Sequence, residues 1–258
     1  MLLCGAVKNC AETAIECGRH ERHIRRPDGI TRVIHASTLK ARSRGLFRKF
    51  KRLILPRRAK KPAGPVDVTR PRMTDREIDR YTALLAGART VIEYGTGGST
   101  LLALGAGVSR LISVETDLGW IGMLRDVPAV AEAERQGRLT FVHVDIGRVG
   151  KWGKPVDDSG AARYAAFASA PWSRCDAPDV VFIDGRFRVA CALETLLRSG
   201  GSTRLAFHDF WKRPQYHVVL PFVDCIDRVD SLAVFKRQAS FNENAATQLL
   251  ERYRTVQD

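Results

Sequence analysis

Acidic side chains stand at the ends of five segments that have the apolar composition of buried strands. Because the ligand site of an open α/β sheet lies beyond the carboxyl ends of its strands, we expect these side chains to share one crevice. A single Asp or Glu is ordinary at the start of a loop or helix, so only their joint placement favours a functional role. In chain order these residues are Glu93, Glu115, Asp145, Asp184 and the adjacent His208 and Asp209.

A glycine-rich turn follows the first of these segments, in the sequence VIEYGTGGST over residues 91–100. Its glycines permit a sharp turn and a close approach of the backbone to a ligand, and Ser99 or Thr100 can cap the following helix. A pyrophosphate-binding turn carries a third glycine where this chain has Thr100, and it disfavours a nearby carboxylate such as Glu93. Glu115 lies 20 residues after Gly95, at the spacing of a ribose-binding acid. The pattern therefore favours a cationic ligand that carries a ribose.

The elements that must position these residues alternate between strands and helices. A capping box of Thr74 and Glu77 predicts a helix over 74–87, and the apolar spacing predicts further helices over 99–104, 117–127, 186–198 and 217–224. Besides the strand before Gly95, strands are predicted over 110–115, 138–145, 178–184, 202–209 and 230–235. This alternation indicates a largely parallel sheet covered on both faces.

The long segment 146–177 lacks clear periodicity, which indicates a functional loop or lid rather than a core element. Two tryptophans lie in it. Trp152 and Trp172 could cover a bound ligand, or they could anchor the segment against the sheet.

Residues 74–235 resemble the class I methyltransferases, which use S-adenosylmethionine on a Rossmann-like sheet. VIEYGTGGST is similar to the family's glycine motif, ISVET to its second-strand acid and HVDIG to its adenine-side acid. FIDG and FHD, in that order, resemble a subgroup with FIDG after the fourth strand and HD after the fifth. The resemblance implies an α/β, Rossmann-like three-layer sandwich with a mostly parallel seven-stranded sheet.

This cofactor matches the acids, since it carries sulfonium and ammonium charges, a ribose diol for Glu115 and an adenine amine for Asp145. The predicted cofactor-binding residues are Glu93, Gly95, Thr96, Gly97, Ser99, Glu115, Asp145 and Ile146.

Methyl transfer to oxygen or nitrogen also needs an aligned acceptor and removal of a proton. The predicted catalytic residues are Asp184, His208 and Asp209. Asp184 could instead cap the next helix, and His208 could hydrogen-bond the backbone. The predicted substrate-binding residues are Arg186, Arg188, Tyr216 and His217. In the subgroup, FIDG is often followed by one residue and then His. Here Arg186, Phe187 and Arg188 follow, which counts against a role carried by that His.

We predict a methyltransferase that acts on a small-molecule or saccharide acceptor. Asp184 and Asp209 could hold Mg²⁺, but two acids do not specify a metal site, so no metal is predicted. One alternative is a nicotinamide-dependent oxidoreductase. The other is a non-catalytic Rossmann-like module whose basic leader binds nucleic acid or a membrane.

The positive charge lies entirely in the leader. Residues 1–72 contain 19 Lys and Arg against 5 Asp and Glu, and residues 73–258 contain 23 of each kind, which leaves the net charge of +14 with the leader. We expect a basic, largely disordered extension over 1–72 and the catalytic domain over 73–258. A short amphipathic helix near 44–55 predicts weak contact of residues 40–62 with nucleic acid or an anionic membrane, although a merely solvated leader is the alternative. The scattered cysteines and the lack of a long apolar run favour a cytoplasmic protein.

Overall fold

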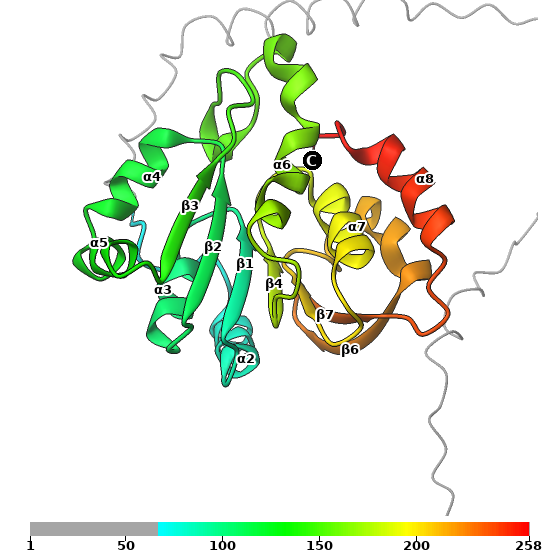
Figure 1. Cartoon of the computed structure of the whole chain (residues 1–258), viewed down its shortest axis with the longest axis horizontal. Helices are drawn as coiled ribbons and strands as arrows, with labels where there is room; N and C mark the ends of the chain where they lie inside the picture. Colours follow the sequence, from blue (N-terminus) through cyan, green and yellow to red (C-terminus); the bar gives the residue numbers. More distant parts are fainter. Residues whose placement is uncertain (1–66, 258) are drawn as a thin grey trace, which may run out of the picture. The chain divides into compact units, whose positions relative to one another are not determined.

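The computed structural model describes residues 67–257, which build one seven-stranded sheet with helices on both of its faces (Figure 1). The strand order is β3-β2-β1-β4-β5-β7-β6. The strands are β1 (Thr90–Tyr94), β2 (Arg110–Glu115), β3 (Leu139–His143), β4 (Val180–Ile183), β5 (Arg204–Phe207), β6 (Val223–Val229) and β7 (Leu232–Arg237). The α/β Rossmann-like architecture predicted from the sequence is therefore confirmed.

The sheet is mixed, which corrects the expectation of a mostly parallel one. The five strands β1 to β5 run parallel, but β7 pairs antiparallel with β5 and with β6, so that β6 and β7 form a hairpin. The helix predicted over 217–224 is a 3₁₀ segment, η4 (Pro214–Phe222), which leads directly into β6. The strand β6, with the sequence VDCIDRV, was not predicted because it is a partly exposed edge strand in which Asp224, Asp227 and Arg228 interrupt the apolar residues.

Helices follow most of the strands, as the alternating pattern predicts. They are α2 (Asp75–Leu85), α3 (Gly98–Gly105), α4 (Leu118–Arg125), α5 (Pro128–Arg135), α6 (Ala165–Ser169), α7 (Arg188–Arg198) and α8 (Glu243–Tyr253). The predicted capping box is present, with Thr74 and Glu77 bonding each other's backbone. Helices α5 and α8 were not predicted. Pro128 reads as a helix breaker although it occupies the first turn of α5, where proline is tolerated.

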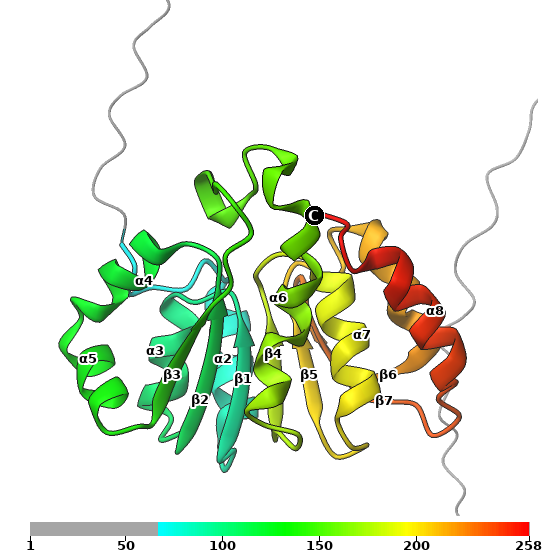
Figure 2. The ribbon, with the colours of Figure 1, turned by 45° about the horizontal axis from the view of Figure 1, so that its top comes forward.

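Alternate residues of each central strand feed two separate hydrophobic cores. Ile92 and Tyr94 of β1 pack against the layer that contains α7 and α8, whereas Val91 packs against the layer that contains α2 and α3. This period of two is the geometry of a strand buried on both faces. Figure 2 shows α6 and α7 in front of the sheet and α2 and α3 behind it.

The segment between β3 and β4 divides into two parts, which corrects its interpretation as a loop or lid throughout. Its first part contains the 3₁₀ helices η1 (Lys151–Gly153) and η2 (Asp158–Arg163) and rises above one edge of the sheet (Figure 2). Its second part, with α6 and η3 (Ala170–Ser173), packs into the core through Tyr164, Phe167 and Trp172. The Trp172 indole N–H donates to the Tyr94 hydroxyl at 2.9 Å, so Trp172 anchors the segment.

The predicted leader helix near 44–55 lies outside the described residues, as does the basic segment 40–62. Within residues 67–257, no helix has both the length and the apolar character needed to cross a bilayer.

Candidate active site

The glycine turn after β1 contacts the turn after β4 through backbone alone. Gly95 has a φ of +92°, and a Cβ placed on it would lie 2.7 Å from the Cα of Gly185. A Cβ on Gly185 would in turn lie 2.9 Å from the Gly95 nitrogen. Both glycines of the two sequence motifs are therefore required, because no side chain fits between these turns. The contact joins the carboxyl ends of β1 and β4 at one edge of the sheet.

Glu93 lies beneath this turn and is fully buried. Its carboxylate accepts hydrogen bonds from the hydroxyls of Ser99 at 2.5 Å, Thr100 at 2.6 Å and Ser113 at 2.7 Å. Burial raises the pKa of Glu93 to about 7, although the three hydroxyls act in the opposite direction. Glu93 thus braces the turn from below. The sequence-based expectation that it faces the cofactor is not supported by this burial, and the Ser99 hydroxyl is engaged in the same way.

Glu115, at the end of β2, lies beside the glycine turn. Its carboxylate accepts from the backbone N–H of Thr96 at 3.2 Å, of Thr116 at 2.6 Å and of Asp117 at 3.1 Å. Burial raises the pKa of Glu115 despite these donors. The donors are all neutral, so this carboxylate has no cation among its hydrogen-bond partners.

Open space lies next to Gly97 in the same turn. A Cβ on Gly97 would meet no atom within 4 Å, in contrast to Gly95. Thr96 is held firmly, since its carbonyl accepts from the Trp120 indole at 2.7 Å. Glu115 is joined to this turn through the Thr96 N–H, so we call Gly97 together with Glu115 the loop site. It lies where the sequence places a cofactor.

The acid after β3 lies in a more open environment. The Asp145 side chain is 64% exposed and accepts from the Gly147 N–H at 2.8 Å, a bond that lowers its pKa. Arg163 contacts the Asp145 carbonyl at 2.8 Å. Ile146 is buried beneath it. Asp145 is therefore accessible to a ligand, while Ile146 presents no exposed surface.

Asp184 and His208 belong to a charged cluster at the ends of β4 and β5. His208 Nδ1 lies 2.9 Å from Asp184, and its Nε2 lies 3.5 Å from Glu77 of α2. Burial lowers the pKa of His208, but the hydrogen bond and charge of Asp184 outweigh it, so the net shift is upward. His208 thus lies between two carboxylates and is only 5% exposed. Its burial leaves little of the imidazole ring accessible to an acceptor.

Glu77 is the member of this cluster that the site prediction missed. It accepts from the Ser231 N–H at 2.8 Å, the Ser231 hydroxyl at 2.6 Å and the Leu232 N–H at 3.1 Å, in addition to capping α2. Its only sequence signal was the capping box, which predicted the helix end and not the contact with the β6–β7 hairpin.

Arg188 and Tyr216 are buried, which removes them from a role at an exposed acceptor site. Arg188 is 4% exposed and donates to the carbonyls of Asp184, Gly185 and His208 at about 3 Å. It also pairs with the Asp184 carboxylate at 3.0 Å. Burial raises the pKa of Asp184, but Arg188 and His208 outweigh this effect and hold it below its usual value. Tyr216 is fully buried.

The remaining predicted residues lie around the end of β5. Asp209 has a φ of +59° and pairs with Arg213 at 3.1 Å. His217 hydrogen-bonds with the Phe210 carbonyl at 3.2 Å. Arg186 is part of the turn that leads into α7, close to Asp184. Asp184, with a side chain that is 29% exposed, and Asp209 are the two acids here that remain partly accessible.

Across residues 67–257, no group of three or more His, Cys, Asp or Glu side chains is arranged to hold a metal ion.

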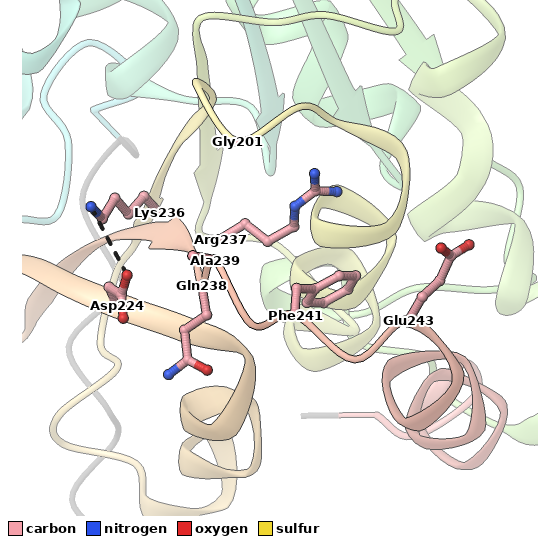
Figure 3. Close-up of a pocket in the computed structure, with 8 residues that line it drawn as sticks. All are labelled: Gly201, Asp224, Lys236, Arg237, Gln238, Ala239, Phe241 and Glu243. Carbon is pink, nitrogen blue, oxygen red and sulfur yellow. Dashed lines mark ion pairs between the residues drawn. The ribbon is translucent and has the colours of Figure 1, made fainter.

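A hollow of about 500 Å³ lies at the opposite edge of the sheet, next to the end of β7 and the turn before β5 (Figure 3). Three of its charged side chains have partners within the protein. Lys236 lies 4.0 Å from Asp224, and Arg237 donates to the carbonyls of Leu196 and Ser199. This hollow lies apart from the strand-end acids.

The strand order, the glycine turn after β1 and the acids at the following strand ends support a Rossmann-like methyltransferase fold. A solved methyltransferase-like protein from Silicibacter pomeroyi is 30% identical to this chain, covers 72% of it and 98% of its own length, and has a TM-score of 0.61. The chain belongs to this methyltransferase-like family.

Other similar structures are more distant. A methyltransferase from Geobacter sulfurreducens is 14% identical, with 65% of this chain and 82% of its own covered at a TM-score of 0.44. An O-methyltransferase from Bacillus cereus in complex with SAH is 14% identical, with 75% and 90% covered at a TM-score of 0.41. No protein-family model matches the sequence, and no curated protein does.

Proposed function

We propose that this protein is a class I methyltransferase that uses S-adenosylmethionine and acts on a small-molecule or saccharide acceptor. The observation that carries the proposal is the loop site, where a Cβ on Gly97 would meet no atom within 4 Å and the nearby carboxylate of Glu115 has only neutral donors. A carboxylate without a cationic partner can accept hydrogen bonds from a ribose diol and is favoured by the nearby positive charge of a sulfonium. The methyltransferase family of the relative from Silicibacter pomeroyi supports the same activity.

The cofactor would be held by residues of the glycine turn and of the next two strand ends. Gly95, Thr96 and Gly97 supply close backbone approach, Glu115 binds the ribose, and Asp145 borders the adenine. Glu93 and Ser99 support the turn from below. When bound, S-adenosylmethionine supplies a methyl group on a positively charged sulfur for in-line displacement.

Asp184 is the proposed base for the acceptor. Arg188 and His208 keep its pKa low, so it remains a carboxylate at neutral pH and can accept a hydrogen bond from an acceptor hydroxyl or amine. His208 positions Asp184, while Asp209 lies next in the chain as a second acid. Arg186 and His217 are the proposed acceptor contacts.

Titration calorimetry tests the cofactor. Wild-type protein should bind S-adenosylmethionine and S-adenosylhomocysteine but not NAD, and Glu115→Gln should weaken both by about tenfold or more, since charge-assisted hydrogen bonds are lost. Glu251→Gln on α8 removes an exposed ion pair with Arg254 and serves as the matched control. Binding of NAD alone would overturn the proposal in favour of an oxidoreductase.

A further inference from the structure

We propose that Arg72 and Trp152 form a clasp across the loop site, and that its opening sets the rate of cofactor exchange. The inference rests on the proposed function, because it takes the loop site as the place of the cofactor. It concerns the segment before α2 and the turn 149–155, to which the proposed function assigns no role.

The segment before α2 is fixed against the glycine turn. A Cβ on Gly98 would lie 2.1 Å from the Pro71 nitrogen and 2.3 Å from the Arg70 carbonyl carbon, so the backbone of residues 70–71 rests directly on Gly98. Two residues later Met73 is buried, and Thr74 caps α2. The backbone on both sides of Arg72 is therefore anchored, which leaves its side chain as the part that can move.

The turn 149–155 is fixed against Glu115. It is closed by a hydrogen bond from the Gly150 N–H to the Lys154 carbonyl at 2.7 Å and by a bridge between Val149 and Pro155. A Cβ on Gly153, whose φ is +65°, would lie 2.5 Å from the Thr116 hydroxyl and 3.3 Å from a Glu115 carboxylate oxygen. The tip of the turn thus lies over the acid of the loop site.

Trp152 occupies this tip in an unfavourable backbone conformation. Its φ is +66°, in the left-handed region that bulky residues seldom adopt. The residue is 47% exposed, so packing in the core does not explain this conformation. Strained residues that packing does not explain concentrate at ligand clamps and moving segments. The strained and exposed Trp152 therefore indicates a role in binding or releasing a ligand rather than in packing of the core.

A contact between Arg72 and Trp152 joins the two fixed segments. The Arg72 guanidinium carbon lies 4.1 Å from the centre of the Trp152 ring, in the geometry of a cation–π pair. Arg72 is anchored beside Gly98 and Trp152 beside Glu115, so the pair connects the two sides of the loop site. Both side chains are exposed, which makes the contact weak enough to open by side-chain rotation alone.

Dissociation of S-adenosylhomocysteine from the full chain, followed by surface plasmon resonance, tests the clasp. Arg72→Ala and Trp152→Ala should each raise the dissociation rate about two- to fivefold, the range for an exposed cation–π pair. The double variant should be no faster than Trp152→Ala alone, because Trp152→Ala already removes the contact with Arg72. Trp152→Phe should restore part of the effect. Arg70→Ala, which removes only an exposed ion pair with Asp75, is the matched control.

Hydrogen exchange of the unliganded protein tests the contact without the cofactor. Arg72→Ala should speed exchange in residues 149–155, and Arg70→Ala should not. Unchanged exchange there, or unchanged dissociation rates while wild-type protein binds S-adenosylhomocysteine, would overturn the clasp alone. Failure of wild-type protein to bind S-adenosylhomocysteine, with exchange in 149–155 still dependent on Arg72, would overturn the proposed function and leave a clasp without a cofactor to hold.

Discussion

The carboxylates at the two halves of the strand-end edge are balanced in different ways. At the ends of β1 and β2, Glu93 and Glu115 are held only by hydroxyls and backbone N–H groups, and burial raises the pKa of both. At the end of β4, Asp184 is paired with Arg188 and His208, and its pKa is lowered. Glu93 and Glu115 thus have no cation among their hydrogen-bond partners, whereas Asp184 lies against Arg188 and His208.

This difference shows where a cationic ligand is favoured. A carboxylate that is already paired with a cation gains little electrostatic stabilisation from a further positive charge. A buried carboxylate whose hydrogen-bond donors are all neutral has no such cation, so a cationic ligand stabilises it more strongly. The half around Glu93 and Glu115 therefore favours a cationic cofactor. The half around Asp184 is already rigid and charged, which suits the orientation of a neutral acceptor.

Substitution of the glycine at the junction of the two halves should have the largest effect. Gly95→Ala should destabilise the protein by about 2–4 kcal/mol, because the methyl group meets the Gly185 backbone and φ is +92°. Gly97→Ala meets no atom and should leave the melting temperature unchanged while it weakens S-adenosylhomocysteine binding. Thermal unfolding and calorimetry measure both. Equal stability of the two variants would contradict the backbone contact.

Glu77 should dominate the acid stability of the paired half. Burial raises its pKa, but donors from Ser231 and Thr74 and the charge of His208 outweigh this and lower it from 4.5 to about 2. The carboxylate therefore contributes stability above pH 4.5 that is lost as the pH falls through about 2, in all about 3 kcal/mol. Glu77→Gln should lose this contribution, so its free energy of unfolding, measured in urea, should depend less on pH between these values than that of the wild type. An equally strong pH dependence in the two proteins would show that other groups cause the acid sensitivity.

Proton release on binding should distinguish the unpaired half. Glu93 has a pKa of about 7, and a nearby positive charge lowers the pKa of a carboxyl group. At pH 7, S-adenosylmethionine should release up to about half a proton more than S-adenosylhomocysteine, which lacks the sulfonium. Calorimetry in buffers of different ionisation enthalpy measures this. Glu93→Gln should abolish the difference, and equal release by the two ligands in wild-type protein would show that Glu93 does not sense the cofactor charge.

The smallest effect on cofactor binding is expected at Asp145, which is neither held only by neutral donors, like Glu115, nor held between two cations, like Asp184. Its side chain is largely exposed, so Asp145→Asn should weaken cofactor binding by only about two- to tenfold, the value of one hydrogen bond. The melting temperature should stay within the error of the wild-type value. A loss as large as that of Glu115→Gln would move the centre of the site toward β3.

Local sequence signals were sufficient for most of the sheet and for the glycine turn. These signals depend only on residues that are close together in the chain, so the structure that they form can be predicted from the sequence. They are the capping box at Thr74, the alternation in β1 and the glycines at 95 and 97. The edge strand β6 was missed because charged residues interrupt its apolar ones, and α5 because its first turn begins at Pro128.

Partners far apart in the chain could not be predicted. Glu77 meets Ser231 across 154 positions, and Gly185 is needed only because Gly95 crosses it. Nor does the sequence show that Glu93 is turned inward and Asp145 outward, since both follow similar apolar runs.

The sequence by itself determined that acids and glycines gather at one edge of an α/β sheet, because strand alternation and turn chemistry are local properties. Only the tertiary structure decided which of those acids have cations beside them, because charge balance depends on side chains from separate elements. His208 and Arg188 come to Asp184 from β5 and α7, and no such group reaches Glu115. That unequal pairing, rather than the number of acids, separates the proposed cofactor half from the acceptor half.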